Sequence, residues 1–130
     1  MENIISINER KTSTGYFNIS TPETILFDLV EFHRQIGGLE QVGLIAIELS
    51  ERLTAKALLE TAQFYPIPII QRAGYLLEII GRNDLSNIIG GHIQDRNPVY
   101  TFLNPSGNRE RINKHPRWKL FINQELEIDL

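Results

Sequence analysis

The sequence predicts an α+β domain with about five helices packed on a small antiparallel sheet. Between residues 21 and 94, apolar side chains recur with the period of about 3.6 that is typical of helices. After Pro98 the period changes to about 2, as in strands with one face toward the core. No linker or repeat interrupts the 130 residues, so we expect a single domain over residues 1–130.

The first helix is predicted by its start. Thr21-Pro22-Glu23 combines a hydroxyl cap, a proline at the first helical position and an acid in the first turn. We expect Phe27 on the outer side, where it would mark contact with another element or chain. The residues expected to face inward are Ile25, Leu26, Leu29, Val30 and Phe32.

Further elements follow from caps and breaks. Gly37-Gly38 precedes a second helix over about 39–53, and Thr54 can cap a third over about 55–64. Asn83 can cap a fifth helix over about 84–94. Residues 3–7 and 15–20 are short and β-prone, so we expect strands there.

The fourth helix is predicted to begin near Pro66 and to end at Gly81, a natural left-handed cap. Gly74 lies on the flank of its apolar stripe, where glycine costs about 1 kcal/mol relative to alanine. We therefore expect another element to pass close to Gly74. The stripe consists of Ile69, Ile70, Ala73, Leu76, Leu77 and Ile80.

The last third of the chain predicts strands. Residues 99–103 form one, with Tyr100 and Phe102 on the same face, and residues 104–108 form a turn cluster. A returning strand carries Trp118, Leu120 and Ile122 in alternation. Leu126, Ile128 and Leu130 alternate with acids and predict an edge strand.

Composition excludes several classes of protein. The chain has no cysteine, so disulfides and thiolate chemistry are ruled out. No apolar run reaches the roughly 20 residues that span a bilayer, and the N-terminus has no signal-peptide pattern, so we expect a cytoplasmic protein without a membrane partner. The net charge is −3, but residues 108–119 carry five basic side chains and one acidic one.

Catalytic motifs are missing from the sequence, so we expect no enzyme, no cofactor and no metal site. The three histidines lie in different predicted elements. His92 and Asp95, spaced i, i+3, could orient an imidazole, which leaves a small enzyme as a minor alternative. Asp28 and Glu31 have the same spacing but lack a third ligand.

Two surfaces are candidates for binding a partner. Arg72, Tyr75 and Ile79 share a narrow sector of the fourth helix, and arginine and aromatic residues dominate binding hot spots. The structural alternative pairs Arg72 with an acid such as Asp28 and packs Tyr75 under a loop.

The second candidate is the basic segment, as a nucleic-acid-binding module. Its residues are Arg109, Arg111, Lys114, Arg117, Trp118 and Lys119. The alternative makes Trp118 a core residue, with solvent-facing cations on a hairpin loop.

Three segments, in this order, resemble the C-terminal domain of the AbiEi-type antitoxins of type IV toxin–antitoxin, or abortive-infection, systems. Residues 16–30 resemble the family's strand and its Thr/Ser-Pro-Glu helix start. Residues 72–78 resemble its Arg-x-Gly-aromatic-Leu-Leu-Glu helix, and residues 100–105 and 117–123 its closing strands with a tryptophan. The resemblance extends over about residues 12–123.

The resemblance implies a non-catalytic antitoxin domain that counteracts a cognate nucleotidyltransferase-like toxin, with or without direct binding. In this family a preceding winged-helix module binds operator DNA and represses transcription. No such N-terminal module is present in this sequence, so we expect DNA as a partner only through such a module.

Overall fold

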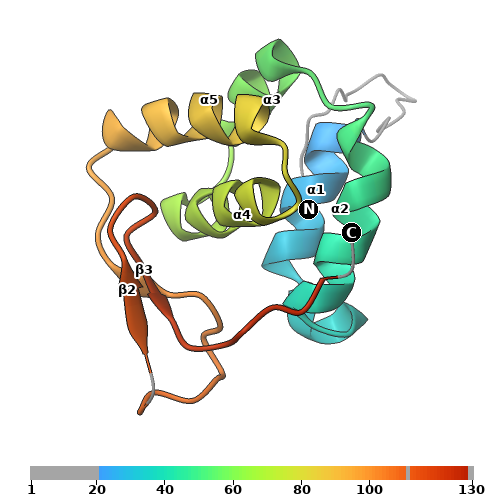
Figure 1. Ribbon diagram of the computed structural model, residues 1–130. Coiled ribbons are helices and arrows are strands. Elements are labelled where there is room, and N and C mark those ends of the chain that lie inside the picture. The colour runs from blue at the N-terminus through green and yellow to red at the C-terminus, as the bar shows by residue number, and fades with distance from the viewer. Residues whose placement is uncertain (1–20, 111, 129–130) are drawn as a thin grey trace, which may run out of the picture.

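Five α-helices, one 3₁₀ helix and three short strands make up the part of the chain that the computed structural model describes, residues 21–110 and 112–128. Figure 1 shows their arrangement. In chain order they are α1 (Pro22–Glu31), η1 (His33–Ile36), α2 (Leu39–Ser50), α3 (Ala55–Ala62), α4 (Ile67–Ile79), α5 (Asn83–Gln94), β1 (Thr101–Phe102), β2 (Asn113–His115) and β3 (Leu120–Ile122).

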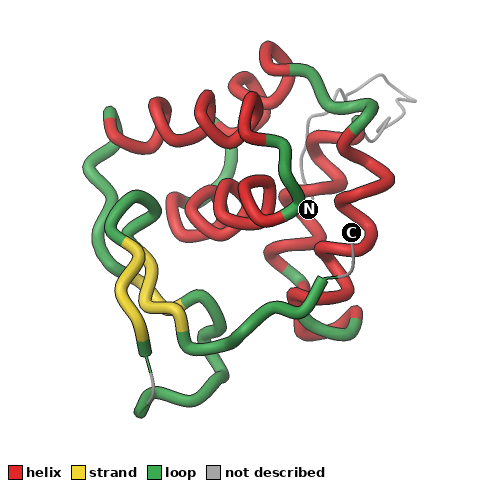
Figure 2. Tube along the Cα trace, in the orientation of Figure 1, coloured by secondary structure: helices red, strands yellow, loops and turns green. Residues whose placement is uncertain are grey.

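The central element is α4, which packs against α5, α1 and α2. The strands lie at one edge of this helical body (Figure 2). The apolar stripe predicted for α4 is confirmed, because Ile70, Ala73, Leu76 and Leu77 are fully buried. Burial of this stripe on several sides makes α4 the common support of the domain.

The sheet is mixed rather than purely antiparallel, although the α+β class is confirmed. Its strand order is β1-β3-β2. β2 and β3 form an antiparallel hairpin, and β1 pairs with β3 in parallel, with Thr101 opposite Leu120. Strand β2 was not predicted from the sequence, because its residues are polar and mostly exposed. Because the chain passes through β2 before it turns into β3, β3 runs in the same direction as β1.

The starts of α1 and α3 agree with the sequence, whereas α2 and α3 end at Ser50 and Ala62, before the predicted ends near 53 and 64. The side chains of Thr21 and Thr54 accept backbone N–H groups of Thr24 and Ala57, respectively, and so cap α1 and α3. Gly81 follows α4 with a φ of +91°, as expected of a left-handed cap. The predicted cap of α5 is wrong: the N-cap is Arg82, without a side-chain cap, and Asn83 is the first helical residue.

Two phenylalanines were assigned to the wrong sides of α1. Phe27 is fully buried, with its ring 5.0 Å from that of Tyr65, because α3 and α4 as well as α2 pack on this helix. The expected contact with another element is thus found, but in the interior. Phe32 is 51% exposed because α1 ends at Glu31, so the helical period no longer places it.

Residues 123–128 do not form the predicted edge strand. They run back along the helices, where the Glu127 N–H donates to the Glu40 carboxylate of α2. Ile128 packs so closely on Gly43 that a Cβ there would overlap with it. The strands predicted at 3–7 and 15–20, and Leu130, lie outside the described residues.

Within the described residues, no helix combines the length and apolar character needed to cross a membrane.

A buried carboxylate joins α1 to the start of α3. Glu23 is 3% exposed, and its Oε2 accepts the Thr54 N–H at 2.8 Å. We expect Glu23→Ala to lower the free energy of unfolding by about 1–3 kcal/mol, because a buried donor loses its partner. Denaturant unfolding measures this loss.

Glu31→Ala is the matched control on the same helix. Burial and the neighbouring Asp28 raise the pKa of Glu31, so its ionised carboxylate is disfavoured rather than stabilised in the folded protein. A control variant as unstable as Glu23→Ala would show that the contact with Thr54 is unimportant.

Candidate functional site

The segment of α4 singled out by the sequence faces the sheet. Gln71 Nε2 lies 3.0, 2.8 and 3.1 Å from the carbonyl oxygens of Val99, Trp118 and Lys119, and Arg72 Nε donates to that of Phe102 at 3.1 Å. Buried carbonyls need donors, and the short strands supply few of them. Gln71 therefore fixes the beginning of the β1–β3 pair to α4, and Arg72 fixes the end of β1.

Trp118 occupies the place that glycine leaves open on α4. Its ring is fully buried against Gly74, where an added Cβ would overlap with three ring carbons. The close approach predicted at Gly74 is confirmed. The same ring also reaches Gly90 of α5, so Trp118 wedges the turn of the hairpin against two helices.

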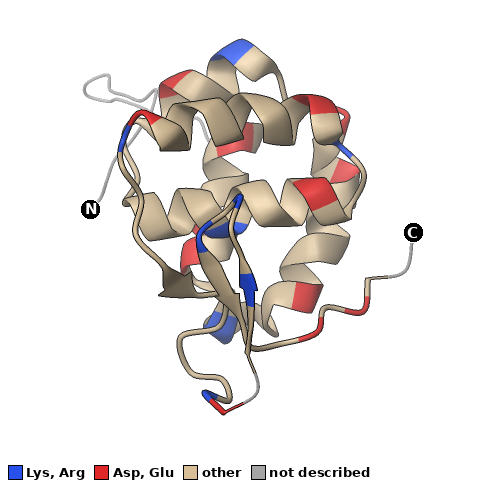
Figure 3. Ribbon diagram, turned by 60° about the vertical axis from the view of Figure 1, so that its left-hand side comes forward, with Lys and Arg blue, Asp and Glu red and all other residues tan. Residues whose placement is uncertain are grey.

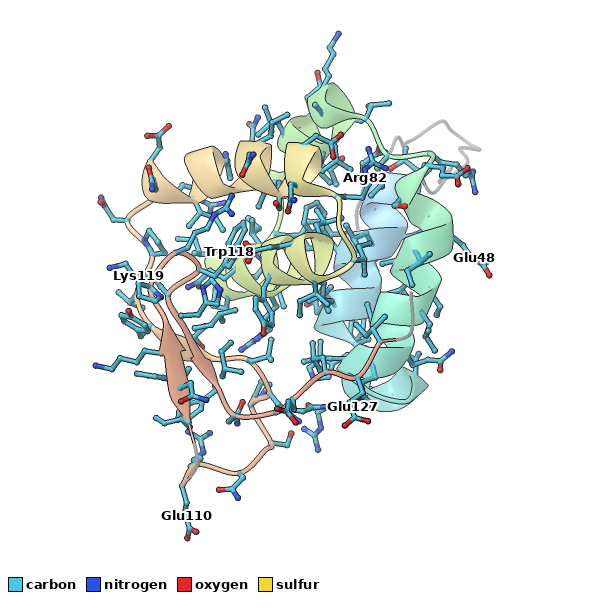
Figure 4. The ribbon with its side chains drawn as sticks, in the orientation of Figure 1. Glu48, Arg82, Glu110, Trp118, Lys119 and Glu127 are labelled. Carbon is cyan, nitrogen blue, oxygen red and sulfur yellow. The ribbon has the colours of Figure 1, made fainter. Side chains whose placement is uncertain are left out.

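Glu78, one turn further along α4, contacts three side chains of the β2–β3 hairpin. Its Oε1 accepts the Trp118 indole N–H at 2.8 Å and the Arg117 guanidinium at 2.9 Å. His115 Nε2 lies 3.7 Å from Oε2. Figure 4 shows Trp118 between α4 and the hairpin. Since the indole N–H is satisfied, burial of this side chain leaves no unpaired donor.

The predicted partner residues do not form one free surface. Arg72 is only 7% exposed, and burial lowers its pKa. Tyr75 is half-buried and meets the ring of His115 edge-on at 5.3 Å, while burial and Glu78 raise its pKa. Ile79 is half-buried and lies outside the hydrophobic core formed by the described residues. A role of these residues in partner binding stays a prediction.

The suggested ion pair between Arg72 and Asp28 is wrong. Asp28 accepts the Tyr65 hydroxyl at 2.6 Å, so its partner comes from the α3–α4 connection. Burial, followed by this hydrogen bond, raises the pKa of Tyr65. The two residues thus serve different joints of the fold.

The residues predicted to bind nucleic acid separate into two groups. Trp118 is a core residue, as the alternative had it, and Arg117 is held by Glu78 and Asn87. Neither presents a free ring or cation. Arg111 lies outside the described residues. The other three, Arg109, Lys114 and Lys119, lie beside aromatic rings of the sheet.

These three cations and three rings form a surface that we term the cationic–aromatic face. Phe121 of β3 stacks on Tyr100 and tilts against Phe102, with ring centroids 5.1 Å apart in both pairs. The cations belonging to the face are Arg109, Lys114 and Lys119. Tyr100 and Phe102 were predicted to share one face of the sheet. Phe121 was not assigned to that face, because β3 was predicted from the alternation of Trp118, Leu120 and Ile122 and not from its pairing with the strand that follows Tyr100.

The remaining candidates are dispersed. His92 is half-buried with Nε2 3.5 Å from Arg96, and burial together with Arg96 lowers its pKa despite Asp95. The described residues contain no group of three side chains able to hold a metal ion.

Comparison with protein families gives a match to the model of the AbiEi antitoxin C-terminal domain over residues 1–79. The chain belongs to this family. Searches of curated proteins and of solved structures found no match. Membership gives this AbiEi-family domain an antitoxin role in abortive infection, and antitoxin domains of this family are generally non-catalytic.

The family match ends with α4, so it includes residues 16–30 and 72–78 but not the sheet. In this AbiEi-family domain, residues 72–78 are nevertheless the segment on which the sheet rests. The resemblance of residues 100–105 and 117–123 to the family's closing strands stays a prediction.

The close contact of Trp118 with Gly74 predicts that alanine substitutions at Gly74 and Gly91, both inside helices, change the free energy of unfolding in opposite directions. Gly74→Ala should lower the free energy of unfolding by about 1–3 kcal/mol, because the new methyl group displaces Trp118. Gly91→Ala, in α5, meets nothing within 4 Å and should raise it by about 0.5–1 kcal/mol.

Denaturant unfolding of both variants checks this, and Gly74→Ala combined with Trp118→Phe tests the cause. Because the smaller ring makes room, the double variant should be more stable than the sum of the two single losses allows. Strict additivity would mean that Gly74 and Trp118 are energetically independent.

Proposed function

We propose that this domain neutralises a cognate nucleotidyltransferase-like toxin without catalysing a reaction. The observation that carries the proposal is the family match over residues 1–79, which includes α1 to α4 and the two resembling segments within them. A nucleotidyltransferase-like toxin uses nucleotides, which are present in the cytoplasm. We therefore propose that the domain acts in the cytoplasm.

The three histidines lie in different elements of the fold. His33 Nδ1 lies 2.8 Å from the carbonyl oxygen of Val30, and His115 Nε2 lies 3.7 Å from Glu78 Oε2. Burial and the neighbouring Arg96 lower the pKa of His92.

We further propose that the toxin contacts the end of α4 at Tyr75 and Ile79. Ile79 is an apolar side chain that the core does not use, and Tyr75 supplies an aromatic anchor. Arg72 contributes indirectly, because it fixes β1 through the Phe102 carbonyl. We assign operator binding, by contrast, to a winged-helix module rather than to this domain.

Co-expression with the proposed cognate toxin tests the function. Growth of cells expressing the toxin should be restored by the wild-type chain. Failure of the folded wild-type chain to restore growth would refute the antitoxin role, and no surface variant is needed for that conclusion.

Ile79→Glu tests the contact surface. We expect it to abolish protection, because a charge replaces an apolar contact, while the unfolding free energy falls by only about 1 kcal/mol, because Ile79 is half-buried and lies outside the core. Leu44→Glu on α2, at a side chain 44% exposed, is the control and should protect fully. Full protection by a folded Ile79→Glu would place the toxin contact elsewhere.

A further inference from the structure

The cationic–aromatic face brings three cations and three aromatic rings together on one side of the sheet. The chain has a net charge of −3, yet three cations gather on one side of the sheet. Figure 3 shows Lys and Arg along the hairpin and on some helices, and Asp and Glu on the helices, on the C-terminal segment and at the tip of the loop before β2. Local positive charge on an acidic protein is an electrostatic signal for an anionic ligand confined to that face.

The three cations have no acidic partner among the described residues. The ion pairs of the described part involve Arg82, Arg117 and His115 instead. Arg109 lies 4.1 Å from the centroid of the Phe102 ring, and Lys114 and Lys119 lie 5.7 and 5.4 Å from that of Tyr100. Cations held over rings rather than by carboxylates remain able to pair with an external anion.

The rings decide which anion fits. Tyr100, Phe121 and Phe102 form a continuous row, and all three are half-buried rather than enclosed in the core. Lys114 and Lys119 are long side chains that can turn from Tyr100 to a phosphate and leave the ring to a base. An acidic peptide would use the charges but not the rings. A duplex keeps the faces of its bases stacked inside.

We propose that the cationic–aromatic face binds a short stretch of single-stranded nucleic acid. Arg109, Lys114 and Lys119 pair with phosphates, and a base stacks on Tyr100 at the end of the row. With strands of two or three residues the face is about 10 Å long, at about 3.3 Å per residue, so only a few nucleotides fit. This binding does not depend on the proposed toxin.

Fluorescence anisotropy of labelled oligouridylate and oligothymidylate, titrated with the full chain, tests the proposal. We expect binding at low salt, with the logarithm of the affinity falling against the logarithm of salt at a slope of about −2 for three phosphate contacts. Lys114→Gln should reduce this slope by about 0.7. Lys56→Gln, on α3, removes the same charge from an exposed position elsewhere and should change neither slope nor affinity.

Tyr100 provides the test of stacking. Tyr100→Leu should weaken binding about fivefold or more, whereas Tyr100→Phe keeps the ring and should bind like wild type. Lys119 is left unchanged because its φ of +53° shapes the hairpin turn. Circular dichroism confirms that each variant is folded.

Four results would overturn the proposal: no salt-dependent binding by the wild-type chain, equal binding of duplex DNA or of polyglutamate, equal losses in Lys114→Gln and Lys56→Gln, or unchanged affinity in a folded Tyr100→Leu variant. Because no toxin is present, these results leave the antitoxin proposal to its own experiment.

Discussion

The burial of Trp118 between α4 and α5, with its indole N–H on Glu78, is the constraint on which the rest of the structure depends. Three strands of two or three residues cannot form an independently stable sheet. Their stability has to come from the helix beneath them. Trp118 supplies the apolar area, Gly74 supplies the space, and Glu78 prevents a buried donor from remaining unpaired.

The same constraint explains why residues 71–78 carry both small and charged side chains. Gln71 and Arg72 donate to sheet carbonyls at one end of the contact, and Glu78 accepts from the hairpin at the other. A partner-binding interpretation of Arg72 therefore competes with a structural use. The candidate binding positions that the core leaves unused are Ile79 and the cationic–aromatic face.

The sequence predicts what local rules decide. The caps at Thr21 and Thr54, the end of α4 at Gly81 and the close approach to Gly74 follow from residue type and periodicity. It fails where tertiary contacts decide. The position of Phe27 depends on helices far along the chain, and the polar strand β2 exists only through its pairing with β3. For the same reason, the sequence indicated Trp118 as the candidate binding ring of the basic segment and not the row of Tyr100, Phe121 and Phe102, which only the sheet register brings together.

Trp118 is the only tryptophan, so its fluorescence reports on the contact of the hairpin with α4 and α5. The most direct test is to follow denaturant unfolding by this fluorescence and by helical circular dichroism in the same samples. If the rest of the structure depends on the burial of Trp118, both signals change in one transition with a common midpoint. A fluorescence transition at lower denaturant, with the helices still folded, would show that the helical body does not depend on Trp118.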